Sequence, residues 1–344
     1  MYITAVETYL PGKNITNEEV GELINFKPQL ISKLFGNYGR HLSTNIKTGE
    51  ITANTTELIS VILEKIFSAN KNSIEDTEFI IVSTATPDYL LPTSVNEACY
   101  KLGLKNIETY QLMAGCSGAV QALKLAQYMI NSKKQKKGIV IGVECSYKFL
   151  NIFNKGGVRL SPREMVNYTL FGDGVGGCIV EDSPSAHSVG IKDIIFQFTG
   201  INEKIGQLAT WKGSRNDIEN DIPMVQEEYK LIEKIVPELT SKIYNELLKN
   251  NAGLKKGNWF MPPQLSGKMV GAICKDMAIP ESKIISLVDK IGNCANAALY
   301  FQIKDFLDAA DDNDEGIAIS IESSRWLSSG LYLSRTPRNG KNIS

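Results

Sequence analysis

One cysteine in this sequence lies in a local context suited to nucleophilic chemistry. Cys116 stands within Gly115-Cys116-Ser117-Gly118-Ala119, after a strand-like segment (109–113) and at the start of a helical pattern. Unpaired N–H groups at a helix N-terminus carry partial positive charge, so we expect them to lower the pKa of Cys116. Such a thiolate can attack an acyl thioester and hold the acyl group covalently, and the same N–H groups can stabilise the oxyanion. The alternative is a buried core cysteine, the usual state of a lone thiol.

Asn293 occupies a comparable place later in the chain, within Gly292-Asn293-Cys294-Ala295 and just before another helical pattern. Its side-chain amide could donate a hydrogen bond to a thioester carbonyl. The alternative is a helix N-cap, a position that asparagine often fills, and both roles can hold together. We expect the adjacent Cys294 to be structural.

Short apolar runs and helical patterns must position these two residues. Segments 79–82, 138–143 and 316–321 are rich in β-branched residues and predict buried strands, while 119–130 and 297–307 predict helices. Alternation of strand and helix favours a mostly parallel, covered sheet. The same series of elements follows Cys116 and Asn293: a helix, a charged break and a strand that begins with glycine. The two series have nearly the same length, which indicates an internal duplication. We therefore expect two similar halves, 1–182 and 183–344.

Bulk properties exclude several classes of protein. The 344 residues carry a formal net charge of −1 with 43% hydrophobic and 22% charged residues, so no bulk basicity indicates a nucleic-acid or membrane partner. The N-terminus lacks the pattern of a signal peptide, and no run approaches the roughly 20 apolar residues of a membrane span. We expect a cytoplasmic protein with six reduced cysteines and, with two histidines and no ligand cluster, no metal site.

Several of these stretches together resemble a known family, the 3-oxoacyl-[acyl-carrier-protein] synthase III group of the thiolase superfamily. The resemblance runs through most of the chain, in five pieces that stand in the family's order: 9–19, 84–94, the Cys116 turn, the glycine-rich 170–177, and 291–293. It implies a thiolase-type duplicated α/β fold of five layers, α/β/α/β/α. It also implies that Cys116 carries the acyl group and that Asn293 acts with a histidine to stabilise an enolate.

The histidine is where the sequence departs from that family. The family typically has Pro-His-Gln-Ala-Asn where this chain reads Pro262-Pro263-Gln264-Leu265-Ser266, so Pro263 stands at the position of the missing histidine. A proline side chain has no donor, acceptor or titratable group. One lost oxyanion donor commonly costs about 3–4 kcal/mol, so decarboxylative condensation should suffer more than acyl loading. His41 and His187 match no catalytic position, and we expect both at the surface.

A second departure lies near the C-terminus. The family's glycine-rich turn, which helps to form the oxyanion hole, is replaced by Glu322-Ser323-Ser324-Arg325-Trp326. A backbone N–H of Ser323 or Ser324 could serve in its place, and Glu322 is a candidate replacement base. The alternative for Glu322 is a solvated or salt-bridged carboxylate.

The resemblance implies an acyltransferase that forms a thioester on Cys116 from acyl-coenzyme A or acyl-carrier protein and passes it to a second substrate. Fatty-acid-related or polyketide-like biosynthesis is the expected setting, with coenzyme A or phosphopantetheine thioesters as substrates and no permanent cofactor. We expect a homodimer, with a heterodimer as an alternative. Lys255, Lys256 and Lys268 are candidates for docking an acidic carrier. Two other functions stay open: a non-catalytic subunit of a heterodimeric condensing enzyme, and a biosynthetic thiolase, which lacks a second catalytic cysteine here.

Overall fold

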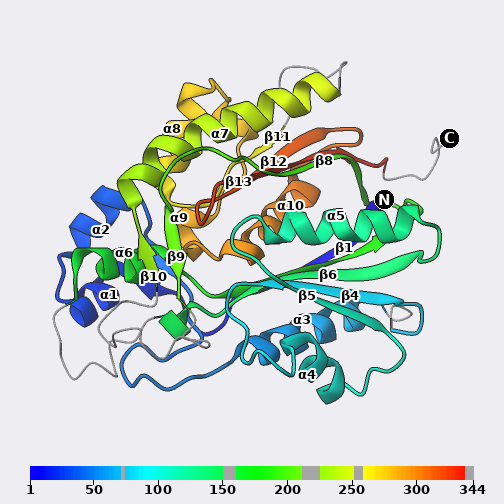
Figure 1. Ribbon diagram of the computed structural model, residues 1–344, viewed down its shortest axis with the longest axis horizontal. Helices are drawn as coiled ribbons and strands as arrows, with labels where there is room; N and C mark the ends of the chain where they lie inside the picture. The colour runs from blue at the N-terminus through cyan, green and yellow to red at the C-terminus, as the bar shows by residue number, and fades with distance from the viewer. Residues whose placement is uncertain (71–73, 150–159, 211–224, 252–258, 338–344) are drawn as a thin grey trace.

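The computed structural model describes residues 1–70, 74–149, 160–210, 225–251 and 259–337 (Figure 1). The first part of the chain contains β1 (Tyr2–Tyr9), β2 (Ile15–Thr16), α1 (Asn17–Ile24), α2 (Pro28–Phe35), β3 (Gly39–Arg40), α3 (Thr55–Ala69), β4 (Phe79–Thr84), α4 (Ser94–Lys101), β5 (Glu108–Met113), α5 (Gly118–Asn131), β6 (Lys137–Glu144), α6 (Pro162–Leu170) and β7 (Gly174–Glu181). The second part contains β8 (Val189–Phe198), β9 (Gln207–Ala209), β10 (Val225–Glu227), α7 (Tyr229–Asn250), β11 (Trp259–Met261), α8 (Gly267–Asp276), α9 (Val288–Ile291), α10 (Ala298–Ala309), β12 (Glu315–Glu322) and β13 (Leu327–Arg335).

The main sheet has a mirrored strand order. Its sequence β11-β12-β13-β8-β1-β7-β6-β4-β5 places β8-β13-β12-β11 on one side and β1-β7-β6-β4 on the other, joined by a short β1–β8 pairing. Each side contains a parallel pair of strands with a helix between them in chain order. These are β4 and β6, with α5 between them, and β11 and β12, with α10 between them. This correspondence agrees with the duplication that the sequence predicts. The exact division at residue 182, between β7 and β8, stays a prediction.

The expectation of a mostly parallel sheet is wrong. β6 with β7, β7 with β1, β8 with β13 and β13 with β12 all pair antiparallel. The physical reason is the connections. Only the strands joined through a crossover helix run parallel, whereas β12 returns directly into β13 through a tight turn, which forces the opposite direction.

Five layers follow from how the helices cover the strands (Figure 1). Helix α3 packs on β1, β6 and β7, and α4 packs beside it. Helices α5 and α10 contact strands from both sides of the sheet and therefore lie between them, and α7 and α8 form the other outer layer. The fold is thus the duplicated five-layer α/β/α/β/α arrangement of the thiolase type. None of the helices in the described ranges is long and apolar enough to span a membrane.

The two central helices carry side chains that suit burial on both sides. In α5 the small residues Ala119, Ala122 and Ala126 are fully buried, so the helix backbone can approach both sets of strands. In α10 the larger Tyr300 and Phe306 fill the same layer. Burying side chains of this size contributes roughly 25 cal/mol per Å² of apolar surface removed from water. This packing fixes the N-terminal ends of both helices; Cys116 lies two residues before α5, and Asn293 lies five residues before α10.

Candidate active site

The Cys116 turn is held from the opposite half of the molecule. It follows β5 and leads into α5, as the sequence predicts. The Ser117 hydroxyl donates to the carbonyl of Ser320 on β12 at 3.2 Å. A Cβ on Gly118 would stand 2.3 Å from Oδ1 of Asn296, so only glycine permits this close approach. The position of Cys116 therefore depends on contacts that span most of the chain.

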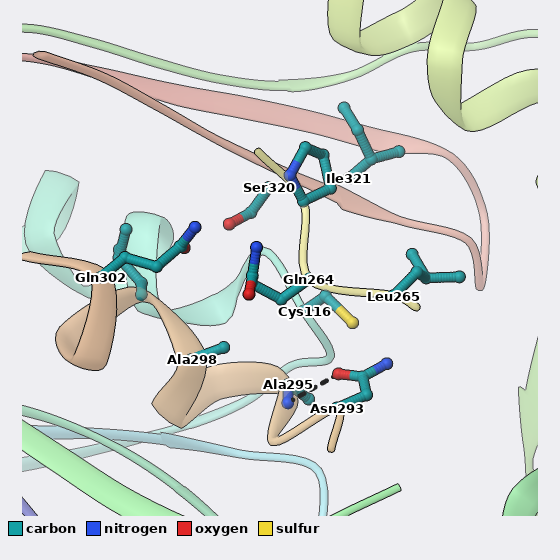
Figure 2. Close-up of a pocket in the computed structure, with 11 residues that line it drawn as sticks. Cys116, Gln264, Leu265, Asn293, Ala295, Ala298, Gln302, Ser320 and Ile321 are labelled. Carbon is teal, nitrogen blue, oxygen red and sulfur yellow. Dashed lines mark hydrogen bonds between the residues drawn. The ribbon is translucent and has the colours of Figure 1, made fainter. Parts of the chain in front are cut away.

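Cys116, Asn293 and Pro263 line one small cavity (Figure 2). The other residues that line it carry no charge: Gln264, Leu265, Ala295, Ala298, Leu299, Gln302, Ser320 and Ile321. Figure 2 shows the sulfur of Cys116 pointing to the side where Leu265 and Asn293 lie. The cavity has a volume of about 20 Å³, which accommodates about one water molecule. Neighbouring side chains must therefore move before an acyl group can enter.

The backbone and side chain of Asn293 are both fixed. Its N–H donates to the carbonyl of Leu170 at 2.8 Å, and its carbonyl accepts from Gly172 N–H at 3.1 Å. The glycine-rich segment that closes the first half thus pairs with the Asn293 turn. The side-chain Oδ1 accepts from Ala295 N–H at 2.9 Å, which orients the amide so that Nδ2 remains as a donor on the other side (Figure 2). The alternative of a helix N-cap is wrong, because Cys294 precedes the 3₁₀ helix Ala295–Ala297 and Ala297 precedes α10. The Oδ1 contact instead closes a local turn and leaves Nδ2 as a donor.

Gln264, beside Pro263, is structural. Its Oε1 accepts from the N–H groups of Leu287 and Val288 at the start of α9, and from Ser286. Its Nε2 donates to the carbonyl of Pro262. The amide is therefore already engaged at both ends and offers the cavity no replacement for an imidazole.

Neither histidine reaches the cavity. His187 is exposed, as predicted, and its Nδ1 lies 3.1 Å from an Arg335 nitrogen. The prediction of a surface position for His41 is wrong: the side chain is half-buried, with Nδ1 3.2 Å from the carbonyl of Pro11. The neighbouring Arg40 is fully buried and donates to Asn17 and Thr169. Local sequence could not show that this loop packs inward.

The expected lowering of the Cys116 pKa is also wrong. Burial raises the pKa of this thiol, and the nearby carboxylates of Glu322, Glu144 and Glu227 raise it further. The helix N-terminus does favour a thiolate, but desolvation and the neighbouring carboxyl groups outweigh it. The site therefore favours the thiol form of Cys116 before a donor binds.

Two of these buried carboxylates were missed at the level of sequence. Glu144 at the end of β6 accepts from Ala85 N–H at 3.1 Å, from Thr86 Oγ1 at 2.9 Å and from Asn296 Nδ2 at 2.5 Å. Asn296 also donates to the Ala114 carbonyl at 2.8 Å, so this pair supports the Cys116 turn from behind. Glu227 at the end of β10 accepts from Gln207 at 2.8 Å. The sequence signal that could have indicated a buried polar partner near the turn was Asn296, three residues after Asn293.

The third carboxylate, Glu322, is neither solvated nor salt-bridged among the described residues. It is buried, and its Oε2 accepts from Gly115 N–H at 3.0 Å. Ser323 is also buried, but it does not line the cavity, and its carbonyl accepts from Gly206 and Gln207. An oxyanion role for the Ser323 N–H stays a prediction.

The remaining candidates lie apart from the cavity or outside the described part of the chain. Cys294 is fully buried, as expected for a structural residue, with its sulfur near three backbone carbonyls. Lys268 is exposed on α8. Lys255 and Lys256 lie outside the described residues. The docking role of the three lysines stays a prediction.

Buried carboxyl groups predict that the protein is most stable on the acid side of neutrality. Burial raises the pKa of Glu144 and of Glu227 to about 7 and that of Asp173 to about 6. Between the unfolded value near 4.5 and the folded value near 7, the folded state keeps a proton that the unfolded chain releases, so stability falls as pH rises. For Glu144 this amounts to at most on the order of 3 kcal/mol. We expect Tm to fall from pH 5 to pH 7.5, and Glu144→Gln to flatten that slope.

Thermal unfolding followed by circular dichroism across this pH range checks the expectation. Glutamine can keep accepting from Ala85 and Asn296 and can donate to Thr86. Glu64→Gln, an exposed carboxylate on α3, is the matched control and should leave the slope unchanged. Equal slopes in wild type and Glu144→Gln would rule out the assignment.

A family model and several proteins of known class match this chain. The model for 3-oxoacyl-[acyl-carrier-protein (ACP)] synthase III matches residues 110–198, from β5 through β8, and so includes Cys116. The beta-ketoacyl-[acyl-carrier-protein] synthase III 2 of Bacteroides thetaiotaomicron is 26% identical over 325 residues, covering 91% of this chain and 90% of the relative. That of Rickettsia rickettsii is 28% identical over 292 residues, covering 85% of each.

Solved structures agree with the fold. AbyA1, described as a tetronic acid condensing enzyme, superposes with a TM-score of 0.90 at 29% identity, covering 96% of this chain and 99% of the other. The 3-oxoacyl-[acyl-carrier-protein] synthase III of Aquifex aeolicus superposes with a TM-score of 0.79 at 20% identity, covering 97% and 99%.

Fold and comparisons together define the class of the protein as an enzyme of the thiolase superfamily. Within that superfamily it is a synthase III-like enzyme, similar to proteins named synthase III and to one described as a condensing enzyme.

Proposed function

We propose that the protein takes an acyl group from a coenzyme A or acyl-carrier-protein thioester onto Cys116 and transfers it to a second substrate. The observation that carries this proposal is the shared cavity, in which the Cys116 thiol and the fixed amide of Asn293 meet. A thiol can exchange with a thioester at almost no change in bond energy, and an N–H donor stabilises the oxyanion that forms in between. Coenzyme A and phosphopantetheine are substrates in this scheme, and no permanent cofactor is needed.

The second substrate in this proposal is not a malonyl thioester, the substrate of decarboxylative condensation. Decarboxylation of a malonyl thioester leaves an enolate that two donors stabilise, and Pro263 supplies no donor where one is expected. The residues lining the cavity include no cation for a malonyl carboxylate. The acceptor is therefore a group that brings its own nucleophile, in fatty-acid-related or polyketide-like biosynthesis.

A second, narrower candidate is a condensation that forms a ring of the tetronic acid type. The similarity to AbyA1, in both TM-score and identity, exceeds that to the Aquifex aeolicus synthase III. A tetronic acid is a five-membered lactone with a 1,3-dicarbonyl unit, so its assembly joins an activated carbon to an acyl carbon. That chemistry suits an acyl-cysteine site without decarboxylation.

Intact mass measurement tests the proposal. The protein is incubated with acetyl-, octanoyl- and malonyl-coenzyme A and with the same acyl groups on a carrier protein, and adducts are mapped to peptides. We expect acyl adducts on the Cys116 peptide, without carbon dioxide release from malonyl donors. No adduct from any donor would contradict the proposal and favour a non-catalytic subunit. A homodimer carrying two such sites is our proposed assembly, and sedimentation of the same sample measures it.

Pro263→His is expected to introduce the missing donor. One oxyanion donor commonly contributes 10²–10³ in rate, so malonyl decarboxylation should rise at least about tenfold even with imperfect geometry. Carbon dioxide release from malonyl-coenzyme A measures it. Pro262→His is the matched control, since that proline is buried next door but does not line the cavity. A folded Pro263→His with unchanged release would show that the imidazole is not what limits decarboxylation.

A further inference from the structure

Transfer without decarboxylation requires a base, and this requirement rests on the proposed function. Loss of carbon dioxide creates a nucleophile without removing a proton. An acceptor with a C–H, O–H or N–H bond must instead give its proton to the enzyme as it attacks the acyl carbon. An imidazole is the usual acceptor for such a proton, and Pro263 removes it from this site. Another proton acceptor must lie next to Cys116.

The three carboxylates around Cys116 are not equally suited to this task. Glu144 lies behind the turn, where its oxygens accept three hydrogen bonds and support Asn296. Glu227 belongs to the β9–β10 hairpin and accepts from Gln207. Glu322 alone contacts the turn that carries the nucleophile, one residue before it.

The geometry of Glu322 is defined from both sides. Its Oε2 accepts from Gly115 N–H at 3.0 Å, and a Cβ on Gly115 would stand 2.9 Å from the carboxyl carbon. Its Oε1 accepts from the hydroxyl of Ser324. The preceding residues of β12, Ser320 and Ile321, line the cavity. Glu322 is 8% exposed, and no lysine or arginine in the described ranges forms an ion pair with it. Each carboxylate oxygen has a second lone pair to receive a proton.

We propose that Glu322 is the general base of the transfer step, acting on a neutral acceptor. Its carboxylate takes the proton of the acceptor X–H while X bonds to the carbonyl carbon of acyl-Cys116. The carbon–sulfur bond then breaks, and the proton passes from the Glu322 carboxyl to the Cys116 thiolate. The products are the acylated acceptor and a Cys116 thiol, with no oxidant or reductant required. The effect of Glu322 on the pKa of Cys116, the largest after burial, agrees with this closeness.

The same charges select the acceptor. Among these carboxyl groups it is Glu322 that acts on the acceptor, because it holds the turn before Cys116, and the residues lining the cavity carry no positive charge. An acceptor with its own carboxylate, such as a malonyl thioester, would enter against this field. A 3-oxoacyl thioester or a hydroxyl compound would enter without that repulsion. The site is therefore specific for uncharged reacting groups.

Glu322→Gln tests the base directly. The glutamine oxygen can still accept from Gly115 N–H, and its amide can donate to Ser324, so the turn keeps both contacts. Enzyme loaded with an acetyl or octanoyl group on Cys116 is mixed with buffer alone, for hydrolysis, or with acetoacetyl-N-acetylcysteamine as a neutral carbon acceptor. Decay of the adduct is followed by intact mass in single turnovers. Once Cys116 is fully loaded, we expect discharge roughly 100-fold slower than in the wild type, the range of general-base effects.

Two further measurements separate a base from a structural role. Formate should restore discharge severalfold in Glu322→Ala, because a small carboxylate can enter the vacated space, and chloride at the same concentration should not. Glu227→Gln is the matched control and should discharge within about threefold of wild type. Equal discharge by Glu322→Gln and wild type, a larger loss in Glu227→Gln, or discharge only by malonyl-coenzyme A would each overturn the proposal. Failure of wild type to load Cys116 would instead contradict the proposed function.

Discussion

Cys116→Ala is expected to eliminate acyl loading, with no adduct under conditions that load the wild-type protein completely. Alanine leaves the turn, the helix start and the cavity lining in place but removes the one cysteine sulfur among the described residues that line the cavity. An oxyanion donor without a nucleophile cannot form the covalent intermediate. Intact mass after incubation with the best donor of the panel measures the loss. Because Cys116 is half-buried, the change in Tm should be small.

Cys99→Ala is the matched control for this loss. Cys99 is a buried thiol on α4, 8% exposed, and burial raises its pKa to about 11. Its removal should leave loading unchanged, since it lies in the outer layer away from the cavity. An adduct that persists in Cys116→Ala and maps to another cysteine would show that the acyl group is carried elsewhere.

The raised pKa of Cys116 changes how this loading must proceed. A thiolate prepared by a helix N-terminus would react with any electrophile, whereas a half-buried thiol beside carboxyl groups is expected to react as its proton is accepted during attack. In the proposed function, donor binding brings the thioester to the Asn293 amide, which would supply the compensating stabilisation of negative charge. Nucleophile activation would then be coupled to the presence of a donor.

The individual strands and helices could be predicted from sequence because their signals are local, whereas the five layers were implied by the family resemblance. The buried strands at 79–82, 138–143 and 316–321 and the helices at 119–130 and 297–307 all appear within a residue or two of their predicted bounds. Strand direction could not be predicted in the same way. It depends on whether each connection crosses over or returns, and β12 to β13 returns through a turn that alternation alone does not show.

In the site, too, the locally determined features could be predicted from sequence and the long-range contacts could not. Cys116 and Asn293 stand in turns whose neighbours in sequence, such as Gly118 and Gly292, are needed for the local geometry. The partners that set their chemistry come from far away: Glu322 reaches Gly115 across 207 residues, and Asn296 reaches Glu144 across 152. No periodicity or spacing connects such pairs, so the electrostatic character of the site needed three-dimensional structure.

Asn293→Asp and Asn293→Ala are each expected to slow acyl transfer by about 10²–10³, the effect of losing one oxyanion donor. The amide of Asn293 has two separable functions, because Oδ1 accepts from Ala295 N–H while Nδ2 remains as the donor. Aspartate keeps the acceptor and adds a charge. Alanine removes the acceptor and adds none. Single-turnover loading and discharge, measured on both variants, report the rates.

Stability distinguishes the two functions in the same pair of proteins. Loss of one intramolecular hydrogen bond costs about 0.5–1.5 kcal/mol, so Asn293→Ala should unfold at a lower temperature, whereas Asn293→Asp keeps the acceptor for Ala295 N–H. The only change that both variants share is the loss of the amide donor. Slow transfer in both therefore assigns the rate effect to Nδ2, whatever each does to stability. If Asn293→Asp transferred at the wild-type rate, the Asn293 side chain would serve only to hold its turn, and the oxyanion would have to be stabilised by backbone N–H groups of the Cys116 turn.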